Sequence, residues 1–123
     1  NPLVLSMING ILFTLPHLSN PEAGEYGWFA ILSWFAFGAG YTLITLRSGS
    51  LDYALGGHAI NNILSMTIVG YEKGAMDVPT LFVASQVDIL YTFITQLVTL
   101  AIFYWIVSRL ESQTTAKAVA ARA

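Results

Sequence analysis

The chain has 123 residues, of which 55% are hydrophobic and 10% are charged, and its mean hydropathy is +0.64. Soluble domains carry about 25% charged residues, so this composition indicates an integral membrane protein. A net charge of −2 leaves no basic face for nucleic acid, and the lack of cysteine excludes disulfides, thiolate metal ligands and cysteine nucleophiles. The chain begins with Asn1-Pro2 instead of Met and has no basic signal-peptide region, so we expect Asn1 to lie inside a longer polypeptide.

Four apolar segments predict an all-α protein, a polytopic bundle of about four transmembrane helices forming a single domain. Each segment is about as long as the hydrocarbon core of a bilayer requires. The connections between them are rich in Pro, Gly and charged residues, which favour turns. The expected spans are residues 2–18, 28–46, 52–70 and 89–108, followed by a tail at 111–123.

The segments that connect the spans also have a predicted structure. Residues 19–27 and 71–79 are predicted to be polar loops, because Pro, Gly and acidic residues cluster there. Residues 80–87 are predicted to form a short interfacial helix before the fourth span. Asp52 and Asp88 are expected to cap the helices that follow them, since a carboxylate accepts hydrogen bonds from unpaired backbone N–H groups.

Basic residues are distributed unevenly between the two ends of the predicted bundle. Four spans place the turn at Arg47 on the same side as Arg109, Lys117 and Arg122, whereas Lys73 is the only basic residue on the other side. Lys and Arg accumulate on the cytoplasmic side of membrane proteins. The C-terminus is therefore predicted to be cytoplasmic.

The first span carries a histidine directly after a proline. Pro16 interrupts helical hydrogen bonding, so the helix is expected to kink or end near His17. Phe13 lies one turn earlier and can pack over the imidazole. A titratable side chain in lipid is costly, and the residues alone leave two interpretations of His17 open: an interfacial residue or a functional ligand.

The third span carries a polar stripe. At 100° per residue, His58, Asn61, Asn62 and Ser65 fall on one side of the helix. Such groups must face protein or a water-filled cavity. Because His58 and Asn62 are one turn apart, both could address one bound atom. An interhelical hydrogen-bond clamp and a reactive site are equally compatible with the stripe.

Small residues on two spans predict close helix contacts. Ala36 and Gly40, with Gly38 between them, form a small-xxx-small pattern on the second span. Gly56 and Gly57 precede the histidine of the third span. Close helix packing is the favoured interpretation of this pair, over room for a substrate backbone beside the imidazole.

These groups make an incomplete hydrolytic site. His58 could hold a proton near neutral pH, and the Asn62 amide could stabilise an oxyanion. The spans contain no carboxylate that could act as a base, and Glu22 and Glu25 are expected to be solvated charges of the first loop. Two histidines and one asparagine also fall short of a catalytic zinc site, which has three protein ligands. No metal or other cofactor is predicted.

Three segments in a fixed order carry a resemblance to a known family. They are F-x-x-x-H at Phe13 and His17, the run GYTLITLRSGSL at residues 40–51, and H-x-x-x-N at His58 and Asn62. The combination resembles the CAAX-protease and bacteriocin-processing family, CPBP, also called Abi. The resemblance covers residues 3–65, about half of the chain.

The resemblance implies a metal-independent intramembrane peptidase of the kind that trims prenylated CAAX tails. It implies that His17 and His58 position and polarise a water or an oxyanion, and that Asn62 binds the oxyanion. Phe13 and Asn61 are assigned to substrate binding. The expected partners are membrane lipid and a peptide or prenylated-protein substrate.

The chain departs from the family pattern in one respect. The family's base lies in an E-E-x-x-x-R motif, which does not occur in these 123 residues. The motif either precedes Asn1 or is lacking from a degenerate member, and the chain as given is expected to be inactive. The alternatives are an inactive subunit that scaffolds a larger membrane complex and, less favoured, a pigment- or haem-binding subunit that uses its histidines as ligands.

The two histidines are expected at different depths in the membrane. His17 lies near the far end of its span, whereas His58 lies near the cytoplasmic end of its own. Their meeting therefore requires strong tilt, a broken first helix or a first span that does not fully cross the bilayer.

Overall fold

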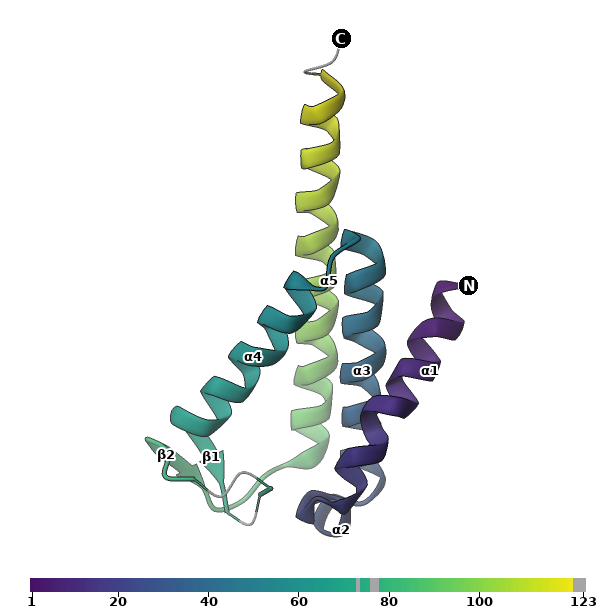
Figure 1. The fold of residues 1–123 in the computed structure, drawn as a ribbon. Helices are drawn as coiled ribbons and strands as arrows, with labels where there is room; N and C mark the ends of the chain where they lie inside the picture. The colour runs from purple at the N-terminus through teal and green to yellow at the C-terminus, as the bar shows by residue number, and fades with distance from the viewer. Residues whose placement is uncertain (73, 76–77, 121–123) are drawn as a thin grey trace.

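The computed structural model describes residues 1–72, 74–75 and 78–120, without the side chains of residues 115, 118 and 119. In this part of the chain, helices form an open bundle that carries one pair of short strands at its lower end (Figure 1). The prediction of an all-α membrane helix bundle is confirmed. The elements are α1 (Pro2–Thr14), the 3-10 helix η1 (Leu15–Ser19), α2 (Pro21–Tyr26), α3 (Trp28–Ser48), α4 (Asp52–Thr67), β1 (Val69–Tyr71), β2 (Phe82–Ala84) and α5 (Ile89–Ala120).

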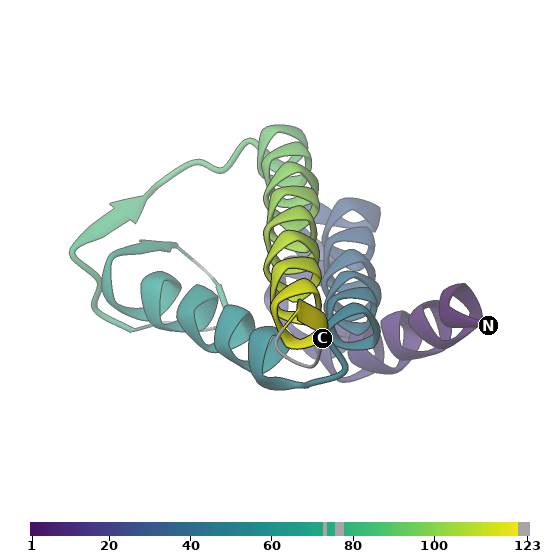
Figure 2. The same ribbon diagram turned by 90° about the horizontal axis from the view of Figure 1, so that it is seen from above.

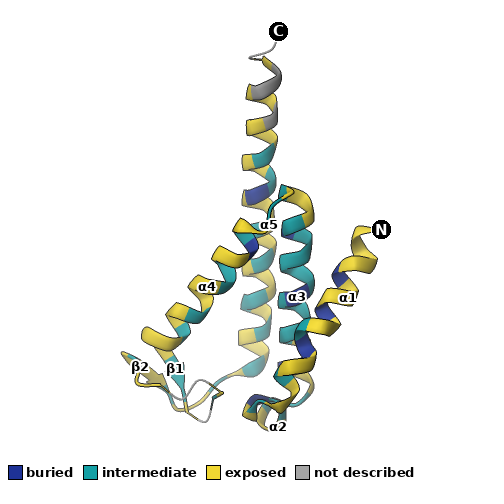
Figure 3. Cartoon of the chain, in the orientation of Figure 1, coloured by how far each residue is buried: buried dark blue, intermediate teal, exposed yellow. Residues whose placement is uncertain are grey.

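Three helical segments of the described chain are long and apolar enough to cross a bilayer. They are Pro2–Ser19, Trp28–Ser48 and Ile89–Thr114, with mean hydropathies of 1.3, 1.6 and 1.8. Their outward surfaces are exposed and apolar, as lipid contact requires (Figure 3). The third predicted span corresponds to α4, which has 16 residues, fewer than the roughly 20 that a perpendicular span needs. Its crossing of the bilayer stays a prediction.

The long helices differ in how they are inclined. Helices α3 and α5 run side by side, while α1 leans across α3 and α4 runs obliquely away from the pair (Figures 1 and 2). The backbones of α1 and α3 approach closely because neither Gly10 nor Gly38 has a side chain. A Cβ at Gly38 would lie only 2.6 Å from Phe13 Cβ and 3.0 Å from Gly10 Cα. This crossing fixes α1 against α3.

The contact face predicted on the second span packs against two neighbouring helices. Gly38 faces α1, whereas a Cβ at Gly40 would lie 3.1 Å from Leu100 Cδ1 on α5. Both glycines therefore permit close helix packing, as their pattern predicted.

The turn between α3 and α4 is closed by a left-handed glycine. Gly49 has φ +72° and donates its N–H to Thr45 O at 2.8 Å. The prediction that Asp52 caps α4 is wrong. The Ser50 hydroxyl accepts the Asp52 N–H at 3.1 Å, and Asp52 itself lies in the first helical turn. The same prediction for Asp88 is confirmed, because Asp88 Oδ1 accepts the Tyr91 N–H at 3.0 Å.

Two predicted connections have a different secondary structure. Within the predicted loop 19–27, residues 21–26 form α2. The predicted helix at 80–87 is wrong, because β2 lies there and pairs in parallel with β1. The last carbonyls of α4 lack partners inside the helix. Thr67 O and Ile68 O accept N–H groups of residues 81 and 82 at 3.0 and 2.8 Å, so an extended segment satisfies them.

Helix α5 is longer than the predicted fourth span. It continues without interruption from Ile89 to Ala120 and rises beyond the other helices, so residues 111–120 of the predicted tail belong to this helix (Figure 1). Residues 121–123 of that tail lie outside the described residues. Arg47, at the end of α3, donates from Nη2 to Ser112 Oγ at 3.1 Å. The α3–α4 turn and the C-terminal part of α5 therefore lie at the same end of the bundle.

Candidate functional site

The first histidine lies where the first helix changes its winding. Helix α1 ends at Thr14, and Pro16 lies in the 3-10 helix η1, so the predicted break near the proline is confirmed. His17 Nδ1 lies 2.6 Å from Phe13 O. A carbonyl oxygen only accepts, so Nδ1 carries the proton of this hydrogen bond. In the neutral imidazole, Nε2 then holds the free lone pair.

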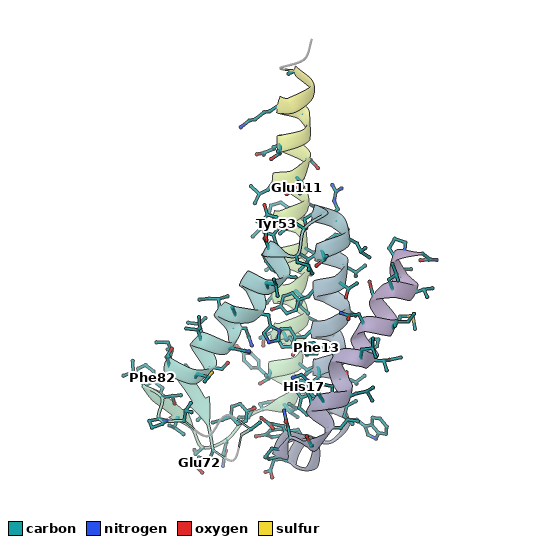
Figure 4. All side chains as sticks on the ribbon, in the orientation of Figure 1. Phe13, His17, Tyr53, Glu72, Phe82 and Glu111 are labelled. Atoms are coloured by element: carbon teal, nitrogen blue, oxygen red, sulfur yellow. The ribbon has the colours of Figure 1, made fainter. Side chains whose placement is uncertain are left out.

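One phenyl ring contacts both histidines. The Phe13 ring stacks on the His17 ring with centroids 4.7 Å apart, and it meets the His58 ring edge-on at 5.5 Å. Phe13 and His17 lie one turn apart at the lower half of α1 and in η1 (Figure 4). The broken first helix and the oblique course of α4 thus bring the two imidazoles to one phenyl ring. The difference in depth that the sequence suggested does not keep them apart.

Further aromatic rings from α3 surround the histidines. Trp34 lies 5.4 Å from His17 and Tyr41 lies 6.0 Å from His58, between ring centroids. Neither residue is predicted from the sequence to contact a histidine. Their positions seven residues apart on α3 correspond to two helical turns, which is the signal that could have placed them on one face.

The polar stripe of α4 is turned inward over most of its length. His58, Asn62 and Ser65 are half-buried, whereas Asn61 is exposed. Three members of the predicted stripe therefore face the bundle. The predicted roles of Asn62 in oxyanion binding and of Asn61 in substrate binding remain predictions.

The two glycines before His58 have different surroundings. A Cβ at Gly57 would lie 2.8 Å from Phe103 Cε1 and 3.1 Å from Tyr41 Cε1. A Cβ at Gly56 would meet nothing within 4 Å. Close packing, the favoured interpretation, therefore applies to Gly57, and this contact holds the start of the stripe against α3 and α5.

An open apolar groove of about 510 Å³ leads to His58 between α1, α3 and α4. Its lining is mostly aliphatic and aromatic, including Leu12, Leu51 and Leu55. Its polar lining residues include Asn9, whose Nδ2 donates to Thr42 Oγ1 at 2.7 Å and links α1 to α3. The groove therefore offers an apolar surface that ends at an imidazole.

Glu22 is not the solvated charge that the sequence predicted. Its side chain is 9% exposed. Oε1 accepts the Tyr71 hydroxyl at 2.7 Å and the Ala75 N–H at 2.9 Å. The prediction fails because Tyr71, 49 residues further along the chain, covers the carboxylate. Glu25 on the same short helix is exposed, as predicted.

The Glu22 carboxylate is anionic at neutral pH. Burial acts to raise the pKa of Glu22, but the hydrogen bonds from Ala75 and Tyr71 outweigh it. The pKa of Glu22 therefore lies below its ordinary value. Burial and the bond to Glu22 raise the pKa of Tyr71, so its hydroxyl stays protonated and continues to donate.

The sequence contained a local signal for the short helix that carries this carboxylate. Asn20-Pro21-Glu22 has an N-cap residue type, a proline at the first helical position and an acid in the first turn, which is typical of a helix start.

Among the described residues, no three His, Cys, Asp or Glu side chains gather as metal ligands would.

Comparison with known proteins identifies the family. Residues 1–64 match the family described as "Rce1-like: Type II CAAX prenyl endopeptidase Rce1-like". The "Uncharacterized protein YyaK" of Bacillus subtilis (strain 168) is 36% identical over 87 residues, which cover 70% of this chain and 29% of that protein. No solved structure matches the chain. The matched segment contains Phe13, His17, His58 and Asn62, so the chain belongs to the Rce1-like family, whose CPBP pattern the sequence resembles.

Proposed function

We propose that the full-length protein containing this chain hydrolyses peptide bonds at the membrane, in a CAAX-like processing reaction. The observation that carries the proposal is the contact of both imidazoles with the Phe13 ring. Family membership supports it, because the family match covers both histidines and Asn62. The conclusion concerns the whole protein, since the chain spans only 29% of the curated relative's length.

The proposed roles follow from the hydrogen-bonding capacity of each group. With Nδ1–H held by Phe13 O, neutral His17 presents Nε2 as an acceptor that can orient a water or take its proton. His58 approaches the same phenyl ring from α4 and acts on the same bound molecule. Asn62, one turn from His58, donates its amide N–H to the developing oxyanion. The E-E-x-x-x-R base of the family is not present in these 123 residues, so the test requires the full-length protein.

The apolar groove is the proposed seat for the apolar part of the substrate. Binding sites for such groups are concave and mostly apolar, with few polar groups that fix orientation. The groove of about 510 Å³ ends at His58 and includes Phe13 on its wall. A peptide or prenylated tail lying there would place its polar backbone toward the imidazoles. Asn61, which is exposed on α4, is proposed to contact the remainder of the substrate.

The proposed orientation places the C-terminus in the cytoplasm. Arg47 bonds to Ser112 on α5, and the Arg109 guanidinium lies 5.5 Å from the Trp105 ring centroid, so these two basic residues share one end of the bundle. The positive-inside rule assigns this end to the cytoplasm. Because the chain contains no cysteine, a single cysteine introduced in place of Gln113 can report its side by its reactivity toward a membrane-impermeant thiol reagent.

The test measures cleavage of a prenylated peptide by the full-length protein in lipid vesicles. H17A, H58A and N62A are expected to lower turnover by roughly 10²- to 10⁴-fold, since general acid–base groups and oxyanion donors each contribute on this scale. T67A is the matched control, because Thr67 is exposed on the same helix and its hydroxyl donates to Ile63 O, one turn earlier on that helix. Unchanged turnover in H58A removes His58 from the mechanism. An inert wild-type protein favours the inactive scaffold subunit.

A further inference from the structure

The second oxygen of the buried Glu22 carboxylate is the starting observation. Oε1 is doubly hydrogen-bonded, but Oε2 is buried and has no hydrogen-bond partner among the described residues. A charged oxygen left unsolvated in a protein interior is costly. Because the carboxylate is anionic, Oε2 requires a donor.

A small cavity is lined in part by Glu22, the residue that carries this oxygen. It has a volume of about 20 Å³ and is lined by Glu22, Ser65, Gly70, Tyr71 and Gly74. A buried water needs roughly 10–15 Å³ of room and two to four polar partners. The cavity meets the first requirement for one water and is too small for a larger ligand.

The cavity also offers polar partners from two parts of the fold. Glu22 Oε2 lies on α2, and Ser65 is the last member of the α4 stripe that contains His58 and Asn62. The Ser65 hydroxyl can both donate and accept. A water placed there can donate one proton to Oε2 and pair with Ser65, so it would join α2 to the polar side of α4.

We propose that Glu22 and Ser65 hold one buried water in this cavity and that the link sets the rotation of α4 about its axis. The other end of α4 is already fixed, because Gly57 packs against Phe103 and Tyr41. Fixing both ends turns Asn62 and His58 toward the Phe13 ring. Glu22 is therefore a positioning residue, and this functional consequence rests on the proposed peptidase activity.

The test is a double-mutant cycle between Glu22 and Ser65 in the full-length protein. No direct hydrogen bond joins these two described side chains, so a direct bond does not account for coupling between them. E22Q keeps the Oε1 acceptor for Tyr71 and Ala75 but replaces the anionic Oε2 by an amide, and S65A removes the hydroxyl. Each single change is expected to lower kcat by on the order of tenfold with KM unchanged, and the double variant is expected to be no worse than either.

The control uses the second glutamate of the same helix. Glu25 is exposed, so E25Q is expected to leave both kinetic constants unchanged and to show no coupling with S65A. Lys73 lies outside the described residues and is included as K73Q, because an ammonium on Oε2 would take the place of the water. Strong coupling of E22Q to K73Q instead of S65A overturns the proposal, as do additive effects of E22Q and S65A.

A second readout keeps the link distinguishable from the peptidase proposal. The unfolding free energies of the same single and double variants are measured in detergent. This measurement requires no turnover. Coupling in stability together with an inert wild type rejects the peptidase while supporting the water link. Hydrolysis that depends on His58 but shows no Glu22–Ser65 coupling in either readout rejects the link alone.

Discussion

The two helices that supply the histidines are held in different ways. Helix α1 crosses α3 at backbone distance through Gly10 and Gly38, and His17 is fixed locally by the carbonyl of Phe13. Helix α4 packs against its neighbours at Gly57, near one end. Its other end is followed by β1, where the Tyr71 hydroxyl donates a hydrogen bond to Glu22. Changes at the α1 crossing should therefore disturb folding, whereas changes around α4 should mainly rotate its polar side.

The largest effect on stability is expected at the α1 crossing. In G38A, the new Cβ would lie 2.6 Å from Phe13 Cβ and 3.0 Å from Asn9 O, so the two helices must separate. Overpacking of this kind costs about 2 kcal/mol, measured as the unfolding free energy in detergent. G24A is the control, because a Cβ there would meet nothing within 4 Å. Equal stability of the two variants would contradict the close crossing.

A smaller effect is expected where α4 packs. In G57A the new Cβ would lie 2.8 Å from Phe103 Cε1, but this atom belongs to a side chain that can shift, so the cost is about 1 kcal/mol. The shift displaces the start of the stripe, and turnover should fall more than stability does. G56A, whose Cβ would lie in open space, should change neither. A turnover loss in G56A as large as that in G57A would reject the packing role.

The link between α1 and α3 on the groove wall is expected to contribute less. N9A removes the donor to Thr42 Oγ1 and Gly38 O, and interhelical hydrogen bonds in membrane proteins average about 0.6 kcal/mol. The unfolding free energy measures this cost. T99A is the control, since the Thr99 hydroxyl donates to Thr95 O on its own helix. A loss in N9A no greater than that in T99A would show that the link does not stabilise the crossing.

The smallest effect concerns pH, because burial of Glu22 opposes the hydrogen bonds that lower its pKa. A carboxylate with a lowered folded-state pKa stabilises the fold above its ordinary pKa, and this contribution is lost as pH falls through the lowered value. The raised pKa of Tyr71 gives a contribution that is present below the ordinary tyrosine pKa and is lost as pH rises through the raised value. The unfolding free energy is measured against pH. Its decrease as pH falls through the lowered pKa of Glu22 should be absent in E22Q and should persist in E25Q.

Local patterns predicted the features that depend on a few neighbouring residues. Pro16 ends α1, the chain turns just after Arg47 at the end of α3, and Asp88 caps α5, each through contacts within about four residues. The same holds for the inward side of α4, because helical periodicity alone places His58 and Asn62 together. These features required no knowledge of distant segments.

The features that the sequence missed depend on distant contacts. Glu22 is buried because Tyr71 bonds to it, and β2 forms because Phe82 N–H reaches the end of α4. The depth at which His17 and His58 meet depends on the inclinations of α1 and α4, which no local pattern specifies. Glycine spacing predicted helix contacts correctly, but it did not predict that Gly38 packs against α1 and Gly40 against α5.

The central claim is that one phenyl ring joins the two histidines into a single site. It is tested most directly by nuclear Overhauser contacts from the labelled Phe13 ring to both imidazoles, in the full-length protein in lipid nanodiscs. The centroid distances of 4.7 and 5.5 Å predict strong contacts to His17 and to His58. Contacts to His17 alone, with the His58 ring close to lipid acyl chains, would contradict the claim.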